Sequence, residues 1–223
     1  MKTLNLKREL IIWIMLLMPF IYAAIAWNSL PNQIPTHWGI SGQPDGWGGK
    51  ISILLMPVIS LGVYLLFTVL PKLDPRKINY QEFPERMFKW RLLFVVYFTV
   101  ISISLIYGGT LNDWSFHNKL FTSSIFVLLA LVGNYMINLK PTWFIGIRTP
   151  WTLSSDHVWK QTHLVFGRIM FYGSLACFAI SIFVQGAPLV TLMVVFVLGT
   201  AVFGYAYSYW LFKKEKETGA IQP

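Results

Sequence analysis

Six long apolar runs follow one another along the chain, and short polar segments separate them. None of the six runs contains Asp, Glu, Lys, Arg or His. A helix needs about 20 consecutive apolar residues to cross the hydrocarbon core of a bilayer. The pattern therefore predicts an all-α integral membrane protein with six transmembrane helices. The predicted spans are Leu10–Trp27, Ile51–Leu70, Leu92–Thr110, Leu120–Leu139, Ile169–Val184 and Leu189–Phe212.

The first run has an alternative interpretation as a cleaved signal peptide. A basic start precedes it, and Ala24-Ile25-Ala26 resembles a cleavage site. The run is longer than a usual signal core, however, and Pro19 lies inside it rather than at a cleavage boundary. We therefore expect a retained transmembrane helix.

Lys and Arg residues are distributed unequally among the polar segments. With the N-terminus inside the cell, the inside segments hold 16 of them and the outside loops hold 2, Lys50 and Lys119. Cytoplasmic loops of membrane proteins carry such an excess. We therefore expect both termini and the segment Lys140–Arg168 in the cytoplasm, with loops 28–50 and 111–119 outside.

Composition agrees with a membrane protein. The 223 residues are 55% hydrophobic and 12% charged, whereas a soluble domain carries about 25% charged residues. The net charge of +9 could indicate nucleic-acid binding, but membrane topology already explains the basic residues, so we expect no direct nucleic-acid contact. The single cysteine, Cys177, lies in an apolar run and is expected to be a packing residue.

The charge-free spans disfavour ion-coupled transport, proton conduction and intramembrane catalysis, which usually require ionisable residues within the bilayer. The outer loops contain two histidines and two aspartates, but without the spacing of a zinc site. We therefore predict no catalytic residue, metal or cofactor. These four outer residues are His37, Asp45, Asp113 and His117.

Three small residues lie four apart on one face of the last span: Thr200, Gly204 and Ser208. Small residues at this spacing let helices approach closely. Packing among the six helices of one chain is the favoured interpretation, and a dimer interface is the alternative.

The outer loop Asn28–Lys50 is rich in turn-forming residues, among them Pro31 and Gly42. Proline fixes φ and cannot donate a ladder hydrogen bond, so the loop is predicted to form turns and short extended pieces. Its Trp38 and Trp47 suit two roles. They could form an interfacial aromatic belt or a surface that binds an amphipathic peptide.

The segment Lys140–Arg168 is the densest in aromatic, basic and turn residues. Gly146 to Pro150 is predicted to turn, and Ser154 or Ser155 to cap a following helix. Val158, Trp159, Thr162 and Phe166 recur near helical spacing. This pattern predicts an amphipathic interfacial helix on the cytoplasmic surface between helices 4 and 5, which could continue directly into the fifth span. Arg148 and Arg168 could bind phospholipid phosphates, cap helix ends or contact a regulatory protein.

Two segments carry a resemblance to known families. GNYMINLKPTWFIGIRTPWTLSSDHVWKQTHLVFGR, residues 133–168, resembles the hallmark of the SdpI family of bacterial membrane immunity proteins. LPNQIPTHWGISGQPDGWGGK and the later DPRKINYQ resemble a domain of unknown function that often precedes it. We therefore divide the chain into residues 1–91, an SdpI-like segment 92–212 with the signature loop 140–168, and a cytoplasmic tail 213–223.

The resemblance implies a non-catalytic protein of the bacterial plasma membrane that confers resistance to a secreted peptide toxin. It also implies signalling, in which a small winged-helix repressor is held at the membrane. The toxin-facing candidates would then be Pro35, Thr36, His37, Trp38, Pro44, Asp45 and Trp47. The cytoplasmic docking candidates would be Trp143, Arg148, Thr149, Trp151, Trp159, His163 and Arg168.

Two other functions compete with this one. A peptide or lipid transporter or flippase would need a polar path through the bilayer, and the apolar runs offer almost none. A membrane enzyme would have to use the His and Asp residues of the polar segments, where no nucleophile has a base at matched spacing.

Overall fold

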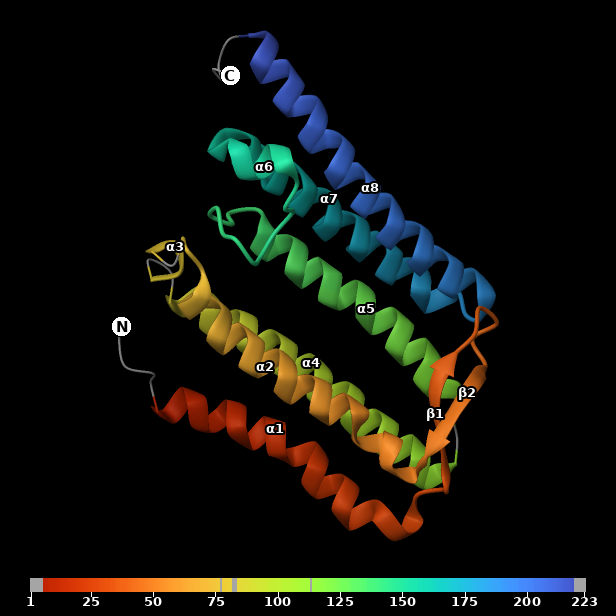
Figure 1. Cartoon of the computed structure of the whole chain (residues 1–223). Helices are drawn as coiled ribbons and strands as arrows, with labels where there is room; N and C mark the ends of the chain where they lie inside the picture. Colours follow the sequence, from red (N-terminus) through yellow and green to blue (C-terminus); the bar gives the residue numbers. More distant parts are fainter. Residues whose placement is uncertain (1–5, 77, 82–83, 113, 219–223) are drawn as a thin grey trace. The chain divides into compact units, whose positions relative to one another are not determined.

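The computed structural model describes residues 6–76, 78–81, 84–112 and 114–218 (Figure 1). Within these described ranges, six helices are long and apolar enough to cross a membrane, which confirms the predicted all-α membrane protein. The candidate spans are Leu6–Ser29, Lys50–Leu73, Glu85–Leu111, Lys119–Met136, Asp156–Phe183 and Ala187–Glu217.

The elements follow the chain in a simple order. The first part consists of α1 (Leu6–Ala26), η1 (Trp27–Ser29), β1 (Gln33–Trp38), β2 (Pro44–Gly49), η2 (Lys50–Leu54), α2 (Leu55–Leu73), α3 (Ile78–Gln81) and α4 (Pro84–Leu111). The second part consists of α5 (Ser115–Met136), α6 (Pro150–Ser154), α7 (Asp156–Phe183) and α8 (Ala187–Glu217).

The chain forms two compact units. Unit 1 consists of residues 1–73 and 80–121, and unit 2 of residues 74–79 and 122–223. The short segment Asp74–Asn79 therefore packs with unit 2, although the residues on both sides of it belong to unit 1.

In unit 1, α1 and α2 pack against α4. One apolar cluster joins Ile12, Leu16, Tyr64 and Val95. Next to it, Arg91 and Glu9 form an ion pair at 2.7 Å, and the Tyr64 hydroxyl donates to Glu9 at 2.8 Å. Both charged residues lie just outside the predicted apolar runs, yet they belong to helices and are buried. Burial of these charges is tolerated because each has a partner.

The loop after α1 is a β-hairpin rather than irregular turns alone. Strands β1 and β2 are antiparallel, and Pro35 lies opposite Trp47. Gly42 between the strands has a φ of 80°, a conformation that glycine adopts without a steric penalty. The predicted turns and short extended pieces are thus confirmed, while their pairing into a sheet was not foreseen.

In unit 2, α5 and α7 approach until their backbones touch. A Cβ atom on Gly133 would lie 2.9 Å from the carbonyl oxygen of Gly167, and one on Gly167 would lie 2.7 Å from that of Gly133. On α8, the predicted stripe of small residues is buried within the chain, and Gly204 packs on Phe166. This observation favours intramolecular packing over a dimer interface.

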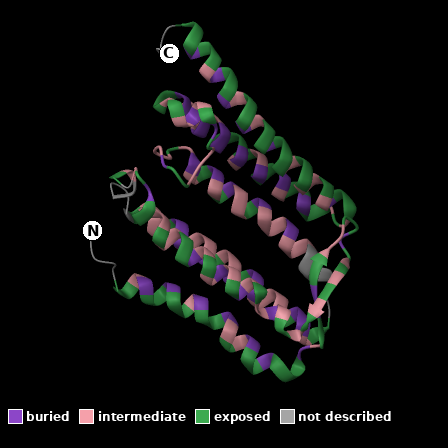
Figure 2. Ribbon diagram, viewed as in Figure 1, coloured by how far each residue is buried: buried purple, intermediate pink, exposed green. Residues whose placement is uncertain are grey.

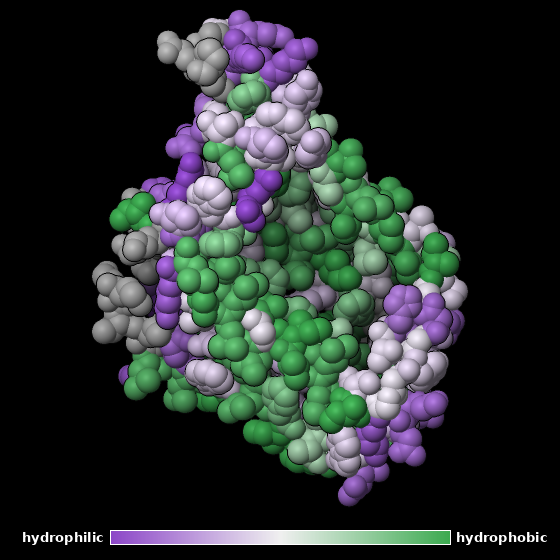
Figure 3. All heavy atoms as spheres, in the orientation of Figure 1, coloured by the Kyte–Doolittle hydropathy of each residue, from purple (hydrophilic) through white to green (hydrophobic). Residues whose placement is uncertain are grey.

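The outward sides of the helices are apolar. Figure 2 shows exposed residues along α8, and Figure 3 shows hydrophobic residues over its middle and hydrophilic ones at its C-terminal end. Val195, Leu198 and Val202 of α8 are each at least 60% exposed. Such surface suits contact with lipid chains.

The expected interfacial helix is not a separate helix in the structure. The chain forms the five-residue helix α6, breaks at Ser155, and then runs as one helix from Asp156 to Phe183. No proline lies between Asp156 and Phe183, so the predicted helix continues directly into the fifth span, as the first part of α7. Its apolar residues Val158 and Trp159 are fully buried in unit 2 rather than turned toward lipid.

Candidate functional site

The hairpin presents an open polar and aromatic surface. The Nδ1 atom of His37 lies 2.5 Å from Oδ1 of Asp45, which joins the two strands. Both side chains remain largely exposed, at 72% and 53%. Trp47 is 50% exposed, whereas the indole nitrogen of Trp38 is buried without a hydrogen-bond partner in the described part of the chain.

The predicted toxin-facing residues therefore lie on one hairpin but differ in accessibility. Thr36, His37, Asp45 and Trp47 are exposed, Trp38 and Pro44 are half-buried, and Pro35 is buried. The four exposed side chains could contact a ligand directly. Pro35 instead packs inward and lies opposite Trp47 in the strand register.

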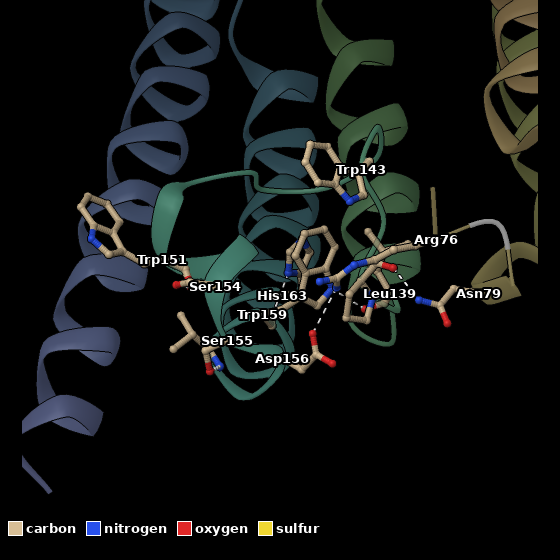
Figure 4. Close-up of polar contacts among 12 residues, drawn as sticks. Arg76, Asn79, Leu139, Trp143, Trp151, Ser154, Ser155, Asp156, Trp159 and His163 are labelled. Atoms are coloured by element: carbon tan, nitrogen blue, oxygen red, sulfur yellow. Dashed lines mark hydrogen bonds and ion pairs between the residues drawn. The ribbon is translucent and has the colours of Figure 1, made fainter. Parts of the chain in front are cut away.

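A second candidate surface is the α5–α6 loop, residues 137–149, which folds over two aromatic side chains of α7. The indole nitrogen of Trp159 donates to the Leu139 carbonyl at 2.8 Å (Figure 4). The His163 ring stacks on Trp159, with centroids 4.1 Å apart. Both side chains are fully buried, because the loop packs over them.

The imidazole of His163 has a defined proton arrangement. Its Nε2 accepts the backbone N–H of Ile147 at 2.9 Å, so this nitrogen carries no proton. Its Nδ1 lies 2.8 Å from the Trp159 carbonyl and must donate to it. The ring is therefore neutral and serves as a bridge between the loop and α7.

Gly146 makes this arrangement possible. Its φ is +116°, and a Cβ atom there would lie 2.5 Å from Nε2 of His163. Any other residue would meet both backbone strain and a steric clash.

The Asp74–Asn79 segment holds the other side of the loop. The Asp74 carboxylate accepts the backbone N–H groups of Trp143 at 2.9 Å and Arg76 at 2.7 Å. The Asn79 amide donates to the Pro141 carbonyl at 2.6 Å. Arg76 also pairs with Asp156 of α7 at 3.1 Å (Figure 4). Three side chains of one short segment thus anchor the loop and the start of α7.

Helix α8 anchors α6 and the start of α7. The Thr149 hydroxyl donates to Ser208 at 3.0 Å, and Thr149 and Thr152 form a capping box for α6. Ser155 caps α7 and also donates to Glu215 at 3.4 Å. His157 contacts the same, largely buried Glu215 carboxylate.

The seven predicted docking residues do not form one accessible surface. Thr149, Trp159 and His163 are buried and hold the local fold together. Trp151 is half-buried between Tyr205 and Tyr209 of α8, each 4.9 Å from it by ring centroid. Trp143, Arg148 and Arg168 are exposed.

Sequence analysis missed the residues that fix the loop from a distance: Asp74, Asn79 and Glu215. For Asp74 a partial signal was present, because Asp before Pro favours a turn closed by its own side chain. Its second contact, to Trp143, spans 69 residues and has no local signature.

Among the described residues, no group of three or more His, Cys, Asp or Glu side chains could hold a metal ion. Of the four outer residues considered, Asp113 and the side chain of His117 lie outside the described part of the chain, as do residues 1–5 and 219–223 of the predicted cytoplasmic termini. The buried ionisable residues Asp74, His163 and Glu215 of the site each have protein partners.

Comparison with known proteins supports the resemblance found in the sequence. Residues 14–61, from α1 to the first part of α2, match the domain of unknown function DUF1648. Residues 138–208 match the SdpI/YfhL protein family and cover the α5–α6 loop, α6, α7 and most of α8. The Asp74–Asn79 segment lies between these two matches.

Two relatives illustrate the range of similarity. The chain is 26% identical to the immunity protein SdpI of Bacillus subtilis, over 94% of this chain and 98% of that protein. It is 28% identical to an uncharacterized protein of Archaeoglobus fulgidus, over 36% of this chain and 40% of that protein. No solved structure matches. The two ordered family matches and the similarity along nearly the full length of both chains lead to one conclusion: the chain carries a DUF1648 domain followed by an SdpI/YfhL family domain.

Proposed function

We propose that this protein is a non-catalytic immunity and receptor protein of the bacterial plasma membrane, which protects its cell against a secreted peptide toxin. The observation that carries the proposal is the similarity to immunity protein SdpI along nearly the full length of both chains. Six apolar helices with polar connections provide the membrane-embedded scaffold that such a role requires.

In this proposal the hairpin β1–β2 is the toxin-facing element. An exposed Trp47 offers an aromatic anchor of the kind that contributes strongly to binding. The exposed His37–Asp45 pair beside it offers a donor and an acceptor for a peptide. We assign the hairpin to the outer side of the membrane on the basis of the positive-inside rule.

The signalling part of the proposal concerns the opposite membrane surface. A small winged-helix repressor would dock on exposed residues of the signature segment, which are Trp143, Arg148 and Arg168. The buried Thr149, Trp159 and His163 would support this surface without touching the partner.

Protection is tested by expressing the chain in toxin-sensitive bacteria and measuring survival against membrane-active peptide toxins from related immunity systems. We expect survival with the unchanged chain and reduced survival with Trp47→Ala at equal amounts in the membrane fraction. Ile40→Ala, also at an exposed hairpin position, is the matched control. No gain in survival with the unchanged chain would contradict the immunity role.

The proposed topology is tested separately with single cysteines and a membrane-impermeant maleimide on intact cells. A cysteine at Ser41 of the hairpin should label from outside, whereas one at Ser154 should label only after the cells are opened. The reverse pattern would invert the assignment of the two candidate surfaces.

A further inference from the structure

The Asp74–Asn79 segment has no assigned role, yet it occupies an unusual place in the chain. It follows α2 without any intervening residue, and it packs entirely within unit 2. Asp74 is only 2% exposed. A buried carboxylate that accepts two backbone N–H groups is a strong local constraint, because bonds to an ionised group are stronger than neutral ones.

The N-terminal end of α2 is joined to the hairpin in the same way, without an intervening loop. Strand β2 ends at Gly49, η2 begins at Lys50, and α2 begins at Leu55. Gly48 of β2 lies against η2, because a Cβ atom there would be 2.2 Å from the Ser52 hydroxyl oxygen. Lys50 also donates to the Trp27 carbonyl at 2.8 Å. No loop separates β2 from the end of α2.

These contacts define a continuous mechanical connection. It begins at the exposed hairpin, passes through η2 and α2, and ends at the Asp74 carboxylate that holds the backbone of Trp143. Trp143 and its neighbour Phe144 are 46% and 41% exposed on the α5–α6 loop. At the loop, the path ends in two hydrogen-bonded side chains, Asp74 and Asn79.

We propose that the Asp74–Asn79 segment is a coupling clasp, which transmits a change at the hairpin to the exposed part of the α5–α6 loop. The role of the clasp as a signal relay rests on the proposed receptor function. The coupling itself does not, because it can be measured without toxin or repressor.

The experiment uses the full chain in lipid nanodiscs, where both membrane surfaces are accessible. A cysteine at Phe144 reports loop exposure through its rate of reaction with a maleimide, and the chain without it corrects for the buried Cys177. Asp74→Asn keeps the size of the side chain but removes its charge and one acceptor. We expect it to raise the labelling rate at position 144 by about threefold or more, as local opening becomes easier.

Coupling is measured with a wedge in the hairpin. Gly48→Ala places a methyl group against Ser52, whereas the matched control Gly49→Ala points into open space, where nothing lies within 4 Å. We expect Gly48→Ala to change labelling at position 144 by about twofold or more and Gly49→Ala to leave it unchanged. In the Asp74→Asn background the wedge should have no further effect, which is the non-additivity of coupled sites.

Two results would overturn the clasp. One is an unchanged labelling rate in Gly48→Ala, and the other is an equal effect of the wedge with and without Asp74. If Gly48→Ala disrupts folding, Ser52→Ala removes the hydroxyl oxygen that lies closest to the added methyl group. The double variant Gly48→Ala/Ser52→Ala should then restore the original labelling rate. Survival assays remain independent, so a chain that couples but does not protect would refute immunity and leave the clasp intact.

Discussion

The hairpin and the α5–α6 loop each contain tryptophan, glycine and proline, yet they use these residues in opposite ways. In the hairpin, His37, Asp45 and Trp47 are exposed on two paired strands. The loop instead rests on Trp159 and His163 of α7, which are fully buried, and its Gly146 fits closely against both. Similar composition thus gives an open recognition surface in one region and a self-supporting scaffold in the other.

The largest expected difference in the free energy of unfolding is between variants of two tryptophans, the buried Trp159 and the exposed Trp47. Trp159→Ala should lower the free energy of unfolding by about 3–5 kcal/mol, because it leaves a cavity and removes the hydrogen bond to Leu139. Trp47→Ala should change it by about 0.5 kcal/mol or less, because the side chain is half exposed. Reversible unfolding in mixed micelles measures both values. Equal losses would remove the distinction between scaffold and surface.

The next effect concerns glycine. Gly146→Ala should destabilise unit 2 by about 1–3 kcal/mol, since alanine at φ +116° is strained and its methyl group meets His163. Gly49→Ala in the hairpin meets neither obstacle, because its φ is −66° and its surroundings are open. Limited proteolysis of the loop gives the measurement. If Gly146→Ala resists proteolysis as well as the unchanged chain does, the loop accommodates the added methyl group and the prediction is wrong.

A third change tests the neutral imidazole. His163→Phe keeps a flat ring on Trp159 but leaves the buried N–H of Ile147 without its acceptor, at a cost of about 1–3 kcal/mol. The hairpin counterpart His37→Phe breaks an exposed pair and should change stability by about 1 kcal/mol or less. Thermal unfolding compares the two. If His37→Phe proved the more costly, the hairpin would depend on the His37–Asp45 contact for folding.

The smallest effect on stability is expected for a change at Arg148, and this change is the most direct test of signalling. Arg148→Ala removes an exposed side chain and should leave unfolding and toxin survival unchanged. Reporter induction through the proposed repressor should fall, with Lys160→Ala, another exposed basic position, as the control. Normal induction in Arg148→Ala would exclude this residue from the docking surface.

The amino-acid sequence was sufficient for the spans and the family, because apolar runs and the 133–168 signature are local patterns. It was insufficient where a residue acts across the chain. Glu9 and Arg91 were placed outside the spans, since charge ends an apolar run even when a distant partner permits burial. The hairpin was missed as a sheet because PDGWGG lacks the alternation of a typical strand. Asp74 and Trp143 lie 69 residues apart and share no pattern.

The continuity of α7 has a geometric consequence. With 28 residues, the helix is about 42 Å long at about 1.5 Å per residue, whereas the hydrocarbon layer is about 30 Å thick. The length of α7 therefore exceeds that thickness by about 12 Å, and the contact of His157 with Glu215 joins the first turn of α7 to the C-terminal part of α8. A helix longer than the hydrocarbon layer tilts or extends beyond it, and α6, which contacts both α7 and α8, is held to this pair of helices in either case.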